Sequence, residues 1–199
     1  MEYTTKDGRI IQLRPVGQRY IDMIRAKHPL PEMPSYTIET VAGDKETHQH
    51  SAIRDDKGHI IKTTLETPED WDTWHAYESG TREAISAQYA AITEFLLYNA
   101  IAEEPPPVEE WGTDLALFGL TPPDPTTEPI QHKAFWVENE LLPDQDDLSG
   151  ILSQLYAMAG IIAADRVHEF ESFFRLTLAR LTAIPTASVP ASRLTNPRA

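Results

Sequence analysis

The sequence has no cysteine among its 199 residues. Disulfide bonds, thiolate metal sites and cysteine nucleophiles are therefore excluded. The absence fits a reducing compartment such as the cytoplasm.

Long apolar segments are also missing. No run approaches the roughly 18–20 apolar residues that a membrane-spanning helix needs. Residues 1–8 are polar and lack the apolar core of a signal peptide. We expect a soluble protein that does not contact membranes and stays where it is made.

The common catalytic motifs are absent. The sequence has no glycine-rich phosphate loop of the Gly-x-Gly-x-x-Gly or Gly-Lys-Ser/Thr type, and no Gly-x-Ser-x-Gly elbow. His168-Glu169 begins like a zinc-protease helix, but Ser172 stands where the second histidine belongs. Asp144, Asp146 and Asp147 fit the first turn of a helix, where the helix dipole explains them. We therefore predict a protein that is not an enzyme and has no catalytic residues, bound metal or cofactor.

Basic residues are scarce in the middle of the chain. Residues 64–150 hold 2 Lys/Arg and 19 Asp/Glu, whereas residues 1–63 hold 10 and 9, and residues 151–199 hold 5 and 3. The net charge of −14 thus comes from the middle block. Such a block repels phosphates, so we expect no nucleic-acid partner. It fits a solvated helical surface or a surface that resists aggregation.

The element pattern predicts an α+β fold: a small β-rich part at 1–66, a helical part at 67–184 and a disordered tail at 185–199. In the first part we expect one small antiparallel sheet and one helix. A hairpin over 3–13 turns at Asp7-Gly8. The expected strands that follow are 35–41, 46–51 and 59–64, and the helix is 16–27, with its apolar face on Val16, Tyr20, Met23 and Ile24.

The stretch 67–102 predicts one long helix around which the rest is organised. Thr67 is suited to cap it, Pro68 to open it, and the carboxylates after them to the positive end of its dipole. Gly80 is its weak point, so the stretch is either one long helix or two helices joined near Gly80, and we favour one helix with a bend there. An apolar stripe recurs at steps of three and four residues: Trp71, Trp74, Tyr77, Thr81, Ile85, Tyr89, Ile92 and Leu96.

Two proline clusters, at 105–107 and 122–125, separate the later elements. Between them, 111–120 is a short helix or an apolar loop. Helices are expected over 129–142, from Pro143 to Gly160, and over 167–181. The tail from Pro185 has too few apolar residues to offset the entropy of ordering it.

Three histidines are the best metal candidates. His48 and His50 are two residues apart, so on a strand they share a face, and His59 is a possible third ligand. They would fit a metal-dependent hydrolase. The segment is polar and rich in turns, so ordinary exposed histidines are the simpler interpretation and the one we adopt.

The order of several segments resembles a known family. These are Leu13–Gln18, the run His28–Tyr36, Thr67-Pro68-Glu69 before a Trp-rich helix, Trp111 beside a proline cluster, and His132, Trp136 and Leu141 before an acidic restart. Together they resemble the tail assembly chaperones encoded among the tail genes of long-tailed bacteriophages. The resemblance covers roughly residues 1–181.

The resemblance implies a non-enzymatic chaperone in the cytoplasm of the infected bacterium. Its partners would be the hydrophobic tape-measure protein and the tail-tube protein. It provides no catalytic residues to transfer. For partner binding we predict the apolar face of the long helix and the loop at 111–120, with Trp71, Trp74, Tyr77, Trp111, Leu117 and Phe118 as contact residues.

Two alternatives stay open. One is a structural virion protein, either a minor tail or a head–tail joining component. The weaker one is a metal-dependent hydrolase that uses His48, His50 and His59. The sequence leaves the oligomeric state open.

Overall fold

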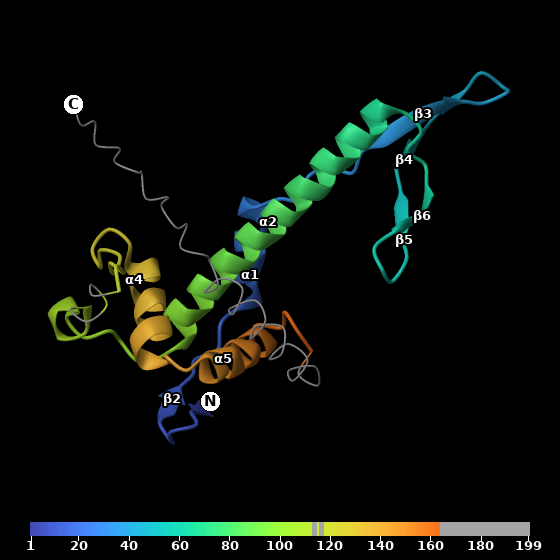
Figure 1. Ribbon diagram of the computed structural model, residues 1–199. Helices are drawn as coiled ribbons and strands as arrows, with labels where there is room; N and C mark the ends of the chain where they lie inside the picture. Colours follow the sequence, from blue (N-terminus) through green and yellow to red (C-terminus); the bar gives the residue numbers. More distant parts are fainter. Residues whose placement is uncertain (113–114, 116–117, 164–199) are drawn as a thin grey trace, which may run out of the picture.

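The computed structural model describes residues 1–112, 115 and 118–163, which form a helical body and a projecting arm (Figure 1). The helices are α1 (Gln18–Lys27), α2 (Pro68–Ala100), α4 (Pro129–Trp136) and α5 (Gln145–Met158), with a 3-10 turn η1 (Val108–Glu110) and a π-helical turn η2 (Val137–Leu141). The strands are β1 (Glu2–Thr4), β2 (Ile10–Gln12), β3 (Ser35–Glu39), β4 (Lys45–Gln49), β5 (Ala52–Arg54) and β6 (Ile60–Thr63). The predicted α+β class is confirmed.

Helix α2 is one continuous helix of 33 residues, as the sequence predicts. The Thr67 side chain accepts a hydrogen bond from the Asp70 backbone, and the Asp70 side chain accepts one from the Thr67 backbone. This capping box satisfies donors that a helix N-terminus otherwise leaves unpaired. In Figure 1, α2 runs from the body, beside α4 and α5, to the hairpins of the arm.

The core of the body gathers around the C-terminal end of α2. Ile92, Leu96 and Leu97 of α2 are buried against α4, η2 and α5. Those elements contribute mainly branched and aromatic side chains, including Trp136, Val137, Leu142, Leu148, Ile151, Leu152, Leu155 and Tyr156. This burial is the main stabilising contribution available to the body.

The first hairpin is part of this body. Strands β1 and β2 pair antiparallel, and Ile11 and Leu13 lie in the core with Ile21 of α1. Two hydrogen bonds join the chain on either side of Leu13 to the end of α2: Arg14 N donates to Ala100 O at 2.7 Å, and Ala102 N donates to Gln12 O at 2.9 Å. The boundary predicted at residue 66 is untested. Residues from both sides of it share one core.

The first third does not form one sheet. It forms three separate two-stranded antiparallel sheets, β1–β2, β3–β4 and β5–β6, and β5 was not among the predicted strands. Every residue of β3 and β4 except Tyr36 is exposed. A larger sheet needs an apolar face to pack on a core, and these strands have none.

The predicted face of α1 is wrong in part. Ile21 is fully buried, whereas Tyr20 and Met23 are about half exposed. Successive helical residues point about 100° apart, so packing on Ile21 and Ile24 leaves Tyr20 and Met23 at the rim. Tyr20 still covers part of Phe95 of α2, with ring centroids 5.7 Å apart.

The later elements follow the predicted order. Predicted helix 129–142 corresponds to α4 and η2, and the carboxylate of Asp144 caps α5 by accepting from the backbone of Asp146 and Asp147. Gly160, with φ of +68°, follows the end of α5. The predicted helix 167–181 and the predicted tail 185–199 lie outside the described residues.

Candidate interaction surface

The arm consists of the hairpins β3–β4 and β5–β6 and the first turns of α2 (Figure 1). Within residues 30–64, all of which the structure describes, His50 is the only buried residue. This part of the chain therefore has almost no core of its own.

His50 is the junction of the arm. Its Nε2 atom lies 3.5 Å from Asp70 Oδ1 on α2, and its Nδ1 atom lies 3.4 Å from Thr64 Oγ1, just after β6. The ring of Tyr36 lies on it, with centroids 4.7 Å apart. Backbone hydrogen bonds from Thr67, first among several contacts, hold the pKa of Asp70 below its ordinary value. The buried imidazole of His50 thus links β3–β4, the end of β5–β6 and the start of α2.

A second link joins β5 to α2. Arg54 donates to the carboxylate of Glu78 at 2.8 Å. This hydrogen bond is the main reason that the pKa of Glu78 is lowered. Two polar links, with little apolar burial, fix the hairpins on the helix.

Large apolar side chains of the arm face solvent. Ile38 is on β3, Val41 is in the turn after it, Ile53 is on β5 and Ile61 is on β6. Leu30 and Met33, in the extended segment before β3, are exposed as well. Exposed apolar side chains of this size are available to a molecule that covers the hairpins.

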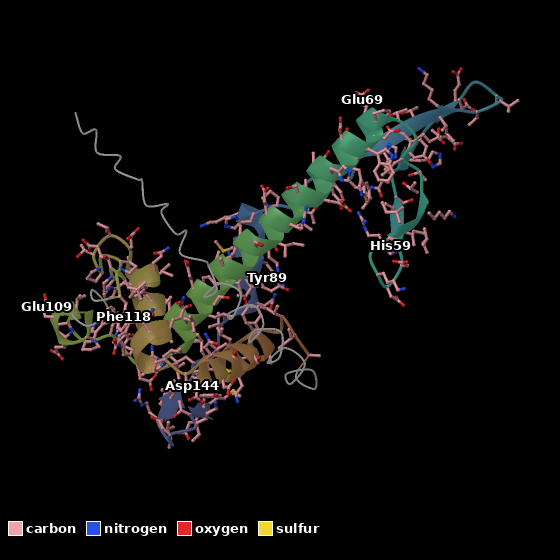
Figure 2. All side chains as sticks on the ribbon, viewed as in Figure 1. His59, Glu69, Tyr89, Glu109, Phe118 and Asp144 are labelled. Atoms are coloured by element: carbon pink, nitrogen blue, oxygen red, sulfur yellow. The ribbon has the colours of Figure 1, made fainter. Side chains whose placement is uncertain are left out.

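The histidines do not form the metal site considered from sequence. Figure 2 labels His59 on the hairpin below β3–β4, where its Nδ1 atom lies 3.2 Å from the Asp55 carboxylate. His48 faces the ring of Tyr36 and lies 3.3 Å from Glu46, while His50 is taken up by the junction. Among the described residues, no group of three or more His, Cys, Asp or Glu is placed to hold a metal ion. His48, His50 and His59 are therefore not brought together in the structure.

The predicted contact residues on α2 lie at the arm end and differ in burial. Trp74 is buried and packs on Tyr77, with ring centroids 5.4 Å apart. Trp71 and Tyr77 are partly exposed. Trp71 and Tyr77 are thus accessible to a partner, whereas Trp74 is buried against Tyr77.

The predicted contact residues of the loop at 111–120 lie at the body end. Trp111 is buried; its Nε1 donates to Pro106 O at 3.1 Å, and its ring meets His132 edge-on. Phe118, labelled in Figure 2, is 78% exposed. Leu117 lies outside the described residues. A partner that contacts this loop therefore meets Phe118 first.

The aspartates at the start of α5 have different surroundings. Asp144 and Asp146 pair with Lys6, whose hydrogen bonds lower the pKa of Asp144. Asp147 is buried and accepts hydrogen bonds from the Lys6 backbone and the Tyr3 hydroxyl. Asp147 therefore joins the first hairpin to α5, beyond the dipole interaction expected from sequence.

Glu138 lies on the π-helical turn η2. Burial, and secondarily the carboxylate of Glu94 on α2, raise the pKa of Glu138 to about 7. The raised pKa of Glu138 reflects the free-energy cost of burying its carboxylate near Glu94 of α2.

Comparisons with known proteins leave the chain without an assigned family. No protein-family model, curated protein or solved structure gave a significant match. None of the helices among the described residues combines the length and apolarity that a membrane span requires.

Sequence reasoning missed three residues that organise the molecule: His50, Asp147 and Lys133. The Lys133 ammonium is buried on α4, donates to Ile101 O and Glu104, and lies 5.6 Å from the ring centre of Tyr98. One signal was available for it, because Lys133 stands directly before an apolar run that begins at Ala134.

Proposed function

We propose that this chain is a non-enzymatic assembly protein that binds other proteins, as the resemblance to phage tail assembly chaperones implies. On this proposal its partners are the tape-measure and tail-tube proteins of the same phage, and it acts in the cytoplasm of the infected bacterium. The proposal includes no catalytic step and no cofactor.

One observation carries the proposal: the arm exposes six large apolar side chains and buries only His50 between residues 30 and 64. Isolated two-stranded hairpins are marginally stable in water, so a partner that covers them also stabilises them. Their free edges offer unpaired backbone groups to an extended segment, and Ile38, Ile53 and Ile61 offer apolar contact.

The charge distribution supports the same role. Residues 30–64 hold 4 Lys/Arg and 6 Asp/Glu, so the arm is close to neutral, whereas residues 64–150 are strongly acidic. A hydrophobic client on the arm would leave the acidic body in solvent. Repulsion between such bodies opposes aggregation of the complexes.

A second candidate is a structural component of the virion, either a minor tail or a head–tail joining protein. The free edges of β3–β4 and β5–β6 favour it, since edge strands can pair permanently with a neighbouring subunit. The two functions differ in fate: a chaperone leaves the tail before the particle is finished, and a structural subunit stays in it.

The test is capture with an affinity-tagged full-length chain from infected cells, followed by identification of bound proteins and analysis of purified particles. We expect tape-measure and tail-tube proteins in the captured fraction, and no tagged chain in the particles. Stoichiometric tagged chain in the particles would favour the structural candidate. Capture of no tail protein would contradict both.

An arm variant sharpens the test. Ile38→Ser, Ile53→Ser and Ile61→Ser change three exposed side chains, so the fold should persist by circular dichroism. We expect at least tenfold less captured partner. The matched control changes exposed polar residues of the same hairpins, Glu39→Ser, Thr47→Ser and Lys62→Ser, and should capture as much as the natural chain. Equal capture by both variants would show that the arm is not the binding surface.

A further inference from the structure

The register of the β3–β4 hairpin shows which backbone groups the outer edge of β3 presents. At one end of the ladder Thr40 N donates to Asp44 O, and at the other end His50 N donates to Pro34 O, each at 2.8 Å. Hydrogen-bonded pairs alternate along an antiparallel ladder, so the even-numbered residues of β3 bond to β4. The odd-numbered residues therefore point their N–H and C=O groups away from β4.

These outward residues of β3 are Ser35, Thr37 and Glu39, and all three are exposed. Within the part of the chain that the structure describes, β3 pairs with β4 alone, and the outward backbone groups bond to no other element. Between them Tyr36 and Ile38 share one face of the strand, where Ile38 is exposed and Tyr36 partly exposed. The edge thus offers both ladder hydrogen bonds and apolar contact.

This edge is complementary to itself. A two-fold axis at Thr37 sets two copies of β3 antiparallel with all five residues of each strand paired. Thr37 then lies opposite Thr37 of the second copy and exchanges both backbone hydrogen bonds with it. Tyr36 lies opposite Ile38 of the second copy, in the closer, non-hydrogen-bonded type of pair. Pairs of threonines, and pairs of an aromatic with a β-branched residue, both stabilise sheets.

Charge is compatible with the same register. Its remaining pair joins Glu39 to Ser35 of the second copy, so no two like charges lie opposite each other. Within each hairpin Glu39 already lies opposite Lys45. In Figure 1 the β3–β4 hairpin lies at the end of α2 that points away from α4 and α5. Contact through β3 therefore leaves the acidic bodies, which repel each other, on opposite sides of the interface.

The outer edge of β4 is less suited to this contact. Its outward residues are Lys45, Thr47 and Gln49, and every residue of the strand is polar and exposed. A lysine on an edge strand opposes pairing with another chain. The absence of any basic residue from β3, together with its two apolar side chains, favours β3.

We propose that β3 is the interface of a homodimer, in which two hairpins join edge to edge as a four-stranded antiparallel sheet. A sheet of this size with an apolar face is more stable than an isolated hairpin, so the pairing also stabilises the arm. A single five-residue edge is small for a specific interface, and the dimer should therefore be weak and depend on concentration. The proposal concerns the chain alone and does not rest on the proposed function.

Sedimentation velocity of the purified full-length chain, from low to high micromolar concentration, measures this association. We expect the dimer fraction to rise with concentration, and Thr37→Pro to weaken association at least tenfold. Proline removes the outward N–H of β3 without taking a donor from the β3–β4 ladder. Thr47→Pro makes the same change at the outer edge of β4 and is the matched control, which should associate like the natural chain.

Two results of this experiment would overturn the proposal. Equal effects of the two prolines would contradict the assignment to β3. A natural chain that stays monomeric at every concentration would leave this edge to another protein, and capture of tail proteins by such a monomer would still support the proposed function.

A second measurement leaves the backbone intact and uses the absence of cysteine. Thr37→Cys sets the thiols of two copies opposite each other, at a Cα separation of about 5.5 Å that a disulfide can span. We expect oxidation to give a covalent dimer at least tenfold faster than with Thr47→Cys, the exposed control on β4. Equal rates would indicate random collision, and faster oxidation of the control would assign the contact to β4. Either result would contradict the proposal.

Discussion

The buried ammonium of Lys133 donates a hydrogen bond to the carbonyl oxygen of Ile101 at 2.9 Å. Ile101 is the residue at which α2 ends, where carbonyl groups lack partners within the helix. A cation at this position also interacts favourably with the helix dipole. The contact therefore connects α4 to the end of the helix on which the body is built.

Lys133→Met should destabilise the body. Methionine fills similar space but leaves the Ile101 carbonyl without its donor, at a cost of about 1–3 kcal/mol. Urea unfolding followed by circular dichroism measures the effect. Lys62→Met on the exposed strand β6 is the control and should change stability by less than about 0.5 kcal/mol. Equal effects of the two substitutions would show that the buried contact contributes little.

Glu138→Gln should stabilise the protein at alkaline pH. The folded state raises the pKa of Glu138 from 4.5 to about 7, so it binds the proton more tightly than the unfolded chain does. The free energy of unfolding therefore falls as pH rises from about 4.5 to about 7. The glutamine should recover at most about 3 kcal/mol at pH 8 and little at pH 4.

Urea titrations of both proteins at the two pH values test this expectation. Glu94→Gln removes only the secondary, Coulombic cause, so its gain at pH 8 should be smaller than that of Glu138→Gln. A gain that is the same at pH 4 and pH 8 would contradict the assignment to ionisation.

His50→Ala should release the hairpins without unfolding the body. The imidazole is the only buried side chain between residues 30 and 64 and contacts both Asp70 and Thr64. We expect amide hydrogen exchange to accelerate at least tenfold over 35–64 and to change little over α5. His48→Ala, at an exposed position of β4 two residues before His50, is the control. Uniform acceleration along the chain would mean that arm and body unfold together.

Thr67→Ala should weaken the start of α2 by about 1 kcal/mol, since it removes one half of the capping box. Hydrogen exchange over the first turns of α2 reports this loss directly. Thr73→Ala, one and a half turns into the helix and exposed, should have an effect of a few tenths of a kcal/mol. Equal losses of stability in the two variants would show that the capping box does not stabilise the N-terminal end of α2.

Local chemistry made much of this fold predictable. Thr67, Pro68 and Asp70 specify a helix start through contacts within four residues, and Asp7-Gly8 specifies a turn in the same way. The number of sheets was not predictable, because it depends on whether separate hairpins find a common apolar face. Tyr20 and Ile21 on α1 illustrate the same limit: either could face inward by spacing, and only the packing against α2 decides.

The candidate surface was predictable only in part. Helical spacing identified Trp71, Trp74 and Tyr77 as one stripe, but it does not show that Trp74 is buried while the other two are partly exposed. The sequence predicts that His50 is an ordinary exposed histidine, whereas the structure buries it. Its burial comes from Asp70 and Thr64, 20 and 14 residues away in sequence, which no local pattern reveals.

The two halves of α2 differ in what surrounds them: Ile92, Leu96, Leu97 and Ala100 are buried at one end, whereas only Trp74 is buried at the other. Local unfolding of α2 should therefore begin at Thr67 and proceed toward Ala100, with the first turns opening at lower free energy than the last. A protein that grips the hairpins would suppress this fraying. Binding of a partner to the arm should therefore slow amide hydrogen exchange along α2, including turns that the partner does not contact.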